Sequence, residues 1–150
     1  MTTVDDAPRA GAPWHLWAVG VLGLLWNSFG AYDYFCSHTK GDAYMRQMGM
    51  TEPQIAYFHA MPAWMTAVWA VGVWGAVLGT ILLLFRSRWA FHVYVASLVG
   101  FLLSLVYAYL LSDGASVMGQ QTSIMNLVIL AGCLFFVWYS RLMAKRGVLR

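Results

Sequence analysis

The chain has 150 residues, of which 61% are hydrophobic and only 10% are charged, and its net charge is +3. Soluble domains are nearer one quarter charged, and a soluble chain of this length could not keep so much apolar surface away from water. The composition therefore excludes an ordinary soluble domain and predicts a membrane protein whose main partner is the lipid bilayer. The few basic residues form no patch suited to a nucleic acid, so we expect no nucleic-acid partner.

Four long apolar segments follow a short polar start. Each has about 20 residues or slightly more, which is enough for a helix to cross a hydrocarbon core of roughly 30 Å. None alternates apolar and polar residues as a barrel strand would. We therefore expect an all-α fold, a transmembrane four-helix bundle that forms a single domain over residues 1–150. The expected spans are residues 14–35, 63–85, 89–111 and 123–143.

The first apolar segment is expected to be a retained helix and not a cleaved signal peptide. Asp5 and Asp6 precede it, whereas a signal peptide begins with basic residues. The apolar run also continues to residue 35, which is longer than the apolar region of a signal peptide.

Orientation follows from the nine Lys and Arg residues. With four spans, Lys40 and Arg46 face one side of the membrane and the other seven face the opposite side. Cytoplasmic loops carry an excess of Lys and Arg. We therefore expect both termini in the cytoplasm and residues 36–62 and 112–122 outside. The seven cytoplasmic residues are Arg9, Arg86, Arg88, Arg141, Lys145, Arg146 and Arg150.

The outer segment at residues 36–62 is too long for a simple turn. Thr51, Pro53 and Gln54 form the pattern of a helix start, with a capping residue, an early proline and a glutamine three positions after the cap. We expect a short helix on the outer membrane surface between the first two spans. A structured loop packed over the bundle is an equally good interpretation.

Small residues recur at spacings of three and four on the second and third spans, which places each set on one helical face. Small faces let helix backbones approach closely in lipid. The functional interpretation is a dimerisation face or a sliding transport interface, and the more ordinary one is packing within a single helical hairpin. These helix-packing residues are Gly72, Gly75, Gly79, Ser97, Gly100 and Ser104.

Polar residues at membrane depth give the candidate site. Asn27 and Asp33 share a face of the first span, and a carboxylate within a membrane costs roughly 2.5–3.5 kcal/mol on insertion scales. Asp33 should therefore face the bundle interior or a water-filled cavity, where it could bind a cation, a sugar hydroxyl or a proton. The alternative is that Asp33 lies at the outer interface, where it is solvated or pairs with Lys40 or Arg46. The full candidate pocket, facing outward, comprises Asn27, Asp33, Tyr34, Tyr57, His59 and Asn126.

The chain shows no signature of an enzyme, a metal site or a cofactor site. Its four histidines form two pairs at two depths, as a two-haem bundle needs, but they lie at helix ends or in loops where a haem would be exposed. No nucleophile and base are paired in the sequence, so we expect no enzyme, no metal and no cofactor. The histidines are His15, His38, His59 and His92.

Three stretches resemble a family of small bacterial four-helix membrane proteins, some of which are automatically labelled sugar transporters. The resemblance covers most of the chain, from residue 14 to residue 141. It implies a location in the bacterial inner membrane, and it assigns no residue a role. The stretches are Trp26-Asn-Ser-Phe-Gly-Ala-Tyr-Asp-Tyr, Ile55-Ala-Tyr-Phe-His-Ala-Met-Pro-Ala-Trp and Trp69-Ala-Val-Gly-Val-Trp-Gly.

The expected function is that of a small accessory or assembly subunit, which acts through helix contacts in a homo-oligomer or a larger membrane complex. The alternative is an oligomeric transporter of a small solute such as a sugar, with a path lined by Asn27, Asp33 and Tyr34. Four helices are few for a transporter built from nested repeats around a broken helix.

Overall fold

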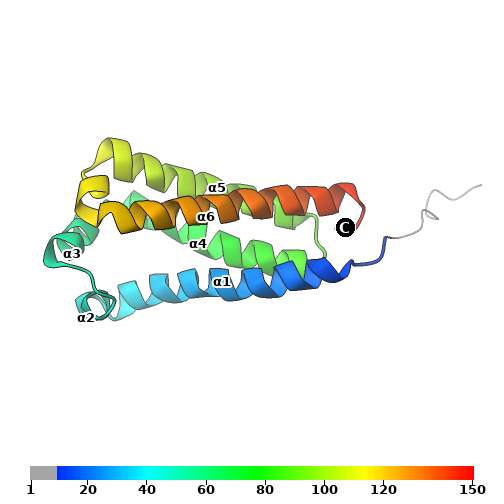
Figure 1. Ribbon diagram of the computed structural model, residues 1–150, viewed down its shortest axis with the longest axis horizontal. Coiled ribbons are helices and arrows are strands. Elements are labelled where there is room, and N and C mark those ends of the chain that lie inside the picture. Colours follow the sequence, from blue (N-terminus) through cyan, green and yellow to red (C-terminus); the bar gives the residue numbers. More distant parts are fainter. Residues whose placement is uncertain (1–9) are drawn as a thin grey trace, which may run out of the picture.

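Four long helices run side by side along the long axis of the molecule (Figure 1). The computed structural model describes residues 10–150, and within them the fold is all-α, as the sequence predicts. Two short helices connect the first long helix to the second. The elements are α1 (Trp14–Thr39), α2 (Asp42–Gln47), α3 (Glu52–His59), α4 (Ala63–Leu84), α5 (Trp89–Val106), the π-helix η1 (Tyr107–Leu111) and α6 (Gly114–Lys145).

Three of these helices are long and apolar enough to cross a membrane, namely α4, α5 with η1, and α6. The predicted spans at residues 63–85 and 89–111 coincide with the first two of them, and the predicted span at residues 123–143 lies within α6. In the described part of the chain, thirty large hydrophobic side chains are exposed, many more than a water-soluble monomer of this size presents. A multi-pass membrane protein accounts for this surface because lipid can cover it.

Two helix boundaries differ from the sequence-based prediction. Helix α1 continues to Thr39, four residues beyond the predicted end, and α6 begins at Gly114, nine residues before the predicted start. The polar residues 112–122 suggested a loop, but most of them are helical. The helix is broken only at Gly119, whose φ of 83° and ψ of 178° are accessible to glycine.

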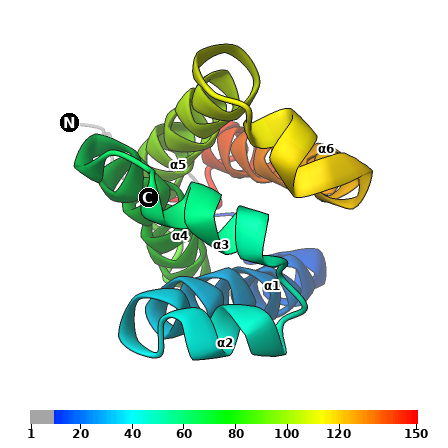
Figure 2. The same ribbon diagram turned by 90° about the vertical axis from the view of Figure 1, so that its left-hand side faces the viewer.

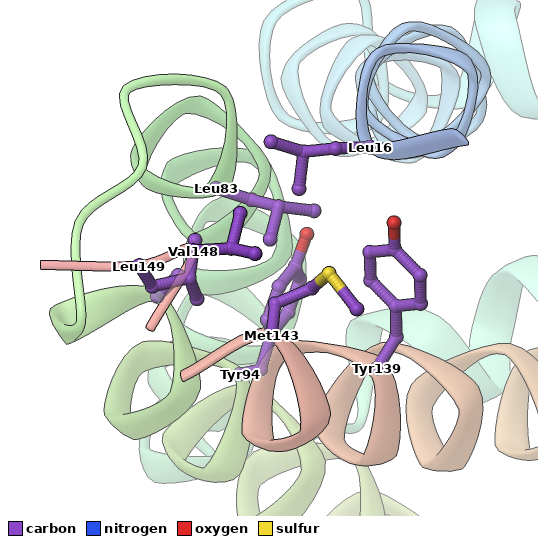
Figure 3. Close-up of a cluster of buried hydrophobic side chains, with 8 residues drawn as sticks. Leu16, Leu83, Tyr94, Tyr139, Met143, Val148 and Leu149 are labelled. Atoms are coloured by element: carbon purple, nitrogen blue, oxygen red, sulfur yellow. The ribbon is translucent and has the colours of Figure 1, made fainter. Parts of the chain in front are cut away.

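Buried apolar side chains close the bundle at the end where the C-terminus lies (Figure 3). Leu16, Leu83 and Met143 have no exposed surface. All four long helices and the C-terminal tail contribute, so this cluster fixes their spacing. It consists of Leu16, Leu83, Ala90, Tyr94, Tyr139, Met143, Val148 and Leu149.

The turn between α4 and α5 holds both ends of the described chain. Arg86 adopts a positive φ of 60° and donates hydrogen bonds from Nε to the carbonyl of Val148 (3.0 Å) and from Nη2 to the carbonyl of Ala10 (2.8 Å). The backbone N–H of Arg150 also donates to the carbonyl of Arg86 (2.7 Å). The tail turns back at Gly147, whose φ is 71°, directly after the end of α6. Residues 1–9 lie outside the described part, including Asp5, Asp6 and Arg9.

Small residues bring α4 and α5 into close contact. An added Cβ on Gly100 would lie 3.2 Å from the backbone nitrogen of Gly72 and 3.2 Å from the carbonyl oxygen of Val68. The hydroxyl of Ser97 donates to the carbonyl of Gly72 at 2.6 Å. The predicted small-residue faces therefore meet each other within this hairpin.

Helix α3 lies across the end of the bundle opposite the termini (Figure 2). The backbone N–H of Thr51 donates to Oε1 of Gln54 at 3.0 Å, which is half of the capping box expected at this helix start. The side-chain Nε2 of Gln54 also lies 3.4 Å from the carbonyls of Val117 and Met118, so α3 is joined to the first turn of α6.

Candidate functional site

A cavity of about 570 Å³ lies between the four long helices and extends to α2 and α3. Extended contact joins α1 to α4, α4 to α5 and α5 to α6, and within residues 10–150 no such contact joins α1 to α6. The helices therefore form an arc around a central space, closed at one end by the buried cluster. Ligand cavities usually measure about 300–1,000 Å³, so this volume suits a small organic molecule.

The wall of the cavity is mostly apolar, with methionine and aromatic side chains prominent. Seven of the nine methionines line it, together with ten aromatic residues. Methionine is flexible and polarizable, so it adapts to ligands of irregular shape. The methionines are Met45, Met48, Met50, Met61, Met65, Met118 and Met125, and the aromatic residues are Trp26, Phe29, Tyr44, Tyr57, Phe58, Trp69, Tyr94, Phe101, Tyr107 and Phe136.

A chain of hydrogen bonds forms one polar level of the cavity, midway along α1. Nδ2 of Asn27 donates to Oγ1 of Thr80 at 2.9 Å, and Thr80 is bonded to the hydroxyl of Tyr94 at 2.8 Å. Asn27 also donates to the carbonyl of Ala76 at 3.3 Å. This chain links α1, α4 and α5. Both bonds made by Asn27 use its amide nitrogen, so its amide oxygen is the group that a ligand can reach.

Asp33 forms a second polar level, six residues further along α1 and thus about 9 Å nearer to α2. Its Oδ1 accepts a hydrogen bond from the hydroxyl of Tyr44 at 2.9 Å. Tyr44 is buried, and burial together with the hydrogen bond to Asp33 raises the pKa of Tyr44 to about 12. Tyr44 therefore remains a neutral hydrogen-bond donor to Asp33 at every physiological pH.

Within residues 10–150, Asp33 forms no salt bridge with Lys40 or Arg46, the pairing considered as an alternative. Arg46 instead forms a two-pronged contact with Glu52, with Nε at 2.7 Å from Oε1 and Nη2 at 3.2 Å from Oε2. Arg46 lowers the pKa of the Glu52 carboxyl through these hydrogen bonds and its charge. Within residues 10–150, the salt bridges involve Arg46 and His59, and none involves Asp33.

Four of the six residues predicted to form a polar pocket line the cavity, namely Asn27, Asp33, Tyr57 and Asn126. The other two, Tyr34 and His59, do not line the cavity and make other contacts. Tyr34 stacks on His38, with ring centroids 4.3 Å apart, and meets Trp69 edge to face.

His59, the remaining member of the predicted pocket, binds Asp42 and does not line the cavity. Its Nε2 lies 2.5 Å from Oδ1 of that carboxylate, so the pair joins α3 to α2. Tyr57, two residues before His59 in α3, lies in the cavity wall and is bonded to Ser112 at 2.7 Å, which joins α3 to the segment between η1 and α6.

The contact between α4 and α5 contains five of the six predicted helix-packing residues, namely Gly72, Gly75, Gly79, Ser97 and Gly100. Three of these five also line the cavity, namely Gly72, Ser97 and Gly100. The sixth, Ser104, lines the cavity as well, and its hydroxyl donates to the carbonyl of Phe101 in its own helix at 2.6 Å.

Sequence reasoning missed the methionine lining. The seven methionines come from several separate segments, so no spacing in the sequence brings them together, and methionine alone more often indicates core packing. Gly132 and Cys133 of α6 also line the cavity and were not singled out as site residues. Within residues 10–150, no three His, Cys, Asp or Glu side chains are grouped so that they could hold a metal ion.

Comparison with known proteins adds no family. No protein-family model matches the chain, and no curated protein or solved structure with which it was compared is similar to it.

Proposed function

We propose that the chain is a four-span, non-enzymatic membrane protein that binds a small amphipathic molecule in the cavity between its helices. The single observation that carries this proposal is the cavity itself, which has an apolar wall and polar groups at two levels. Binding sites for small molecules combine these two features, because apolar surface gives affinity and a few polar groups fix orientation.

The proposal of four spans rests on α1. This helix has 26 residues and is thus about 39 Å long, more than a hydrocarbon core requires. It runs beside the three apolar helices in Figure 1. Leu22, Leu25 and Phe35 are each more than half exposed, which suits contact with lipid. Its polar residues Asn27 and Asp33 line the cavity, so the polar side of α1 is turned away from lipid.

The proposed orientation places the end with the termini in the cytoplasm. The end of the bundle that contains the termini carries six of the eight Lys and Arg residues in the described part, and the opposite end carries Lys40 and Arg46. The positive-inside rule then places α2 and α3 on the outer side. A bacterial inner membrane follows from the family resemblance.

The cavity supports ligand binding better than the role of an accessory subunit. The small-residue faces were the main reason to expect a partner helix, and within this chain they pack α4 against α5. The cavity also gives little support to a sugar as the ligand. A sugar carries many hydroxyl groups that each need a hydrogen-bond partner, whereas most of the wall is apolar.

The proposal is tested by filling the cavity. Gly132 lines the cavity, and an added Cβ there has no neighbouring atom within 4 Å, so Gly132→Leu adds a side chain at the cavity wall. Ala131→Leu is the matched control, because Ala131 is the exposed neighbour on α6 and does not line the cavity. We expect small molecules that co-purify after gentle extraction to be reduced at least tenfold by Gly132→Leu and unchanged by Ala131→Leu, as measured by mass spectrometry. Equal amounts in both variants would contradict the proposed function.

A further inference from the structure

We infer that the molecule bound in the cavity is a lipophilic organic cation, and that Asp33 is the residue that selects its charge. This inference rests on the proposed function, and it names the chemical class of the ligand. The carboxylate of Asp33, the absence of a basic side chain among the described lining residues and the aromatic wall carry it together.

The first argument is charge. Of the 35 described residues that line the cavity, Asp33 is the only one with a formally charged side chain. Its hydrogen-bond donor, Tyr44, is neutral, and the salt bridges of the described chain leave Asp33 out. Within residues 10–150, this carboxylate in an apolar cavity therefore has no counter-ion. A cationic ligand supplies that counter-ion, whereas an anionic ligand is repelled.

The second argument is the wall. Ten aromatic residues surround the space, and the faces of Trp, Tyr and Phe rings attract organic cations through their quadrupoles. Trp26 and Phe29 on α1 lie within two turns of Asp33, so the carboxylate and aromatic faces belong to one side of the cavity. Methionine side chains complete a surface that adapts to alkyl or aryl substituents.

The third argument weighs against calcium and magnesium. Calcium and magnesium require six or more oxygen ligands, including water, held in a defined geometry. Among the described lining residues, Asp33 is the only carboxylate, and one of its oxygens already accepts a hydrogen bond from Tyr44. A cation that carries its own apolar shell does not need such a ligand set.

The test compares two ions of the same shape and opposite charge, tetraphenylphosphonium and tetraphenylborate. Each is titrated by equilibrium dialysis against the purified full chain in detergent, with protein-free micelles as the blank. We expect saturable binding of one tetraphenylphosphonium per chain and at least tenfold weaker binding of tetraphenylborate. Asp33→Asn should weaken tetraphenylphosphonium binding at least tenfold, and Asp33→Glu, which keeps the charge, should retain most of it.

The control for the carboxylate is Asp113→Asn, because Asp113 is an exposed carboxylate at the same end of the bundle and does not line the cavity. It should leave both affinities unchanged. If Asp33→Asn does not fold, the comparison of the two ions on the unaltered chain still decides whether the cavity prefers a cation.

Equal affinity for the two ions overturns the cation inference. If Gly132→Leu weakens both equally in that case, the cavity still binds ligands and the proposed function stands. Absence of saturable binding by either ion also overturns the inference, and the proposed function is then decided by the co-purified molecules and the Gly132→Leu variant.

Discussion

Thr80 shows how single polar residues hold this bundle together. It has no exposed surface, and its hydroxyl connects Asn27 of α1 with Tyr94 of α5 while also donating to the carbonyl of Ala76. In lipid, such hydrogen bonds link helices that no hydrophobic force drives together. Asn27 and Tyr94, which this hydroxyl joins, both line the cavity, so the stability of the bundle and the geometry of the site depend on one side chain.

Thr80→Val should therefore lower the free energy of unfolding by about 1 kcal/mol, because interhelical hydrogen bonds in membranes contribute about 0.6 kcal/mol on average and up to about 1.7 kcal/mol. Unfolding in mixed micelles measures the change. Thr122→Val is the control, since the hydroxyl of Thr122 bonds only within its own helix, to the carbonyl of Met118. An equal loss in both variants would show that the interhelical bonds contribute nothing.

The polar residues of the site were easier to predict than its apolar ones. Asn27 and Asp33 could be found from the cost of placing their polar side chains in lipid. Tyr34 lies seven residues after Asn27 and thus on nearly the same side of α1, but its ring packs against His38 and Trp69. The methionines could not be found, because their contribution depends on how helices that are distant in sequence are placed around the cavity.

At the level of elements, glycine is required at one position of the α4–α5 hairpin, whereas α1 contains a glycine position that tolerates alanine. The Cβ of an alanine at position 100 would lie 3.2 Å from backbone atoms of α4, and a backbone cannot move aside as a side chain can. At position 30 of α1, an added Cβ meets nothing within 4 Å. The same Gly→Ala substitution can therefore be compared at a position with close backbone neighbours and at a position without them.

Gly100→Ala should lower the free energy of unfolding by about 1–3 kcal/mol, the usual cost of overpacking. Gly30→Ala should be neutral or stabilising by up to about 1 kcal/mol, because alanine has the higher helix propensity. The thermal midpoints of the two variants in one detergent give the comparison. Two shifts of the same sign would contradict the assigned contact between α4 and α5.

Helix ends were the least predictable part of the fold. The start of α3 followed from Thr51 and Gln54, because a capping box is a local pattern. The start of α6 did not, because residues 114–118 owe their position to contacts with α3 and η1. Tyr57 illustrates this dependence, since its hydroxyl fills the space next to Gly114. The π-turns of η1 at the end of α5 also left no pattern in the sequence.

At the level of the whole molecule, the number of spans decides which surfaces share a compartment. With four spans, the segment before α1 and the turn at residues 86–88 lie on the same side, and α2 lies on the other. If α1 did not cross, the segment before α1 would lie on the same side as α2. The two arrangements therefore differ in whether the segment before α1 lies on the same side of the membrane as α2, and labelling can measure this.

Single cysteines at Gly11, Ala43 and Ser87 make that comparison in a chain whose Cys36 and Cys133 are replaced by serine. None of the three substitutions changes the charge bias. In intact cells, a membrane-impermeant maleimide should label only the cysteine at position 43, and permeabilised cells should show labelling at all three. Labelling of positions 11 and 43 together in intact cells would show that α1 does not cross the membrane.

The arc of helices has one further consequence. Helices α1 and α6 meet through side chains near the buried cluster, where His15 bonds to Tyr139 and Phe136 lies against Gly23. Beyond that point, their glycines Gly30 and Gly132 border the cavity with no neighbour close to them. If the cavity binds a ligand as proposed, a ligand dissolved among the acyl chains would enter between α1 and α6 without passing through water. Its occupancy would then depend on its mole fraction in the bilayer, and its apparent affinity on how much lipid accompanies the protein.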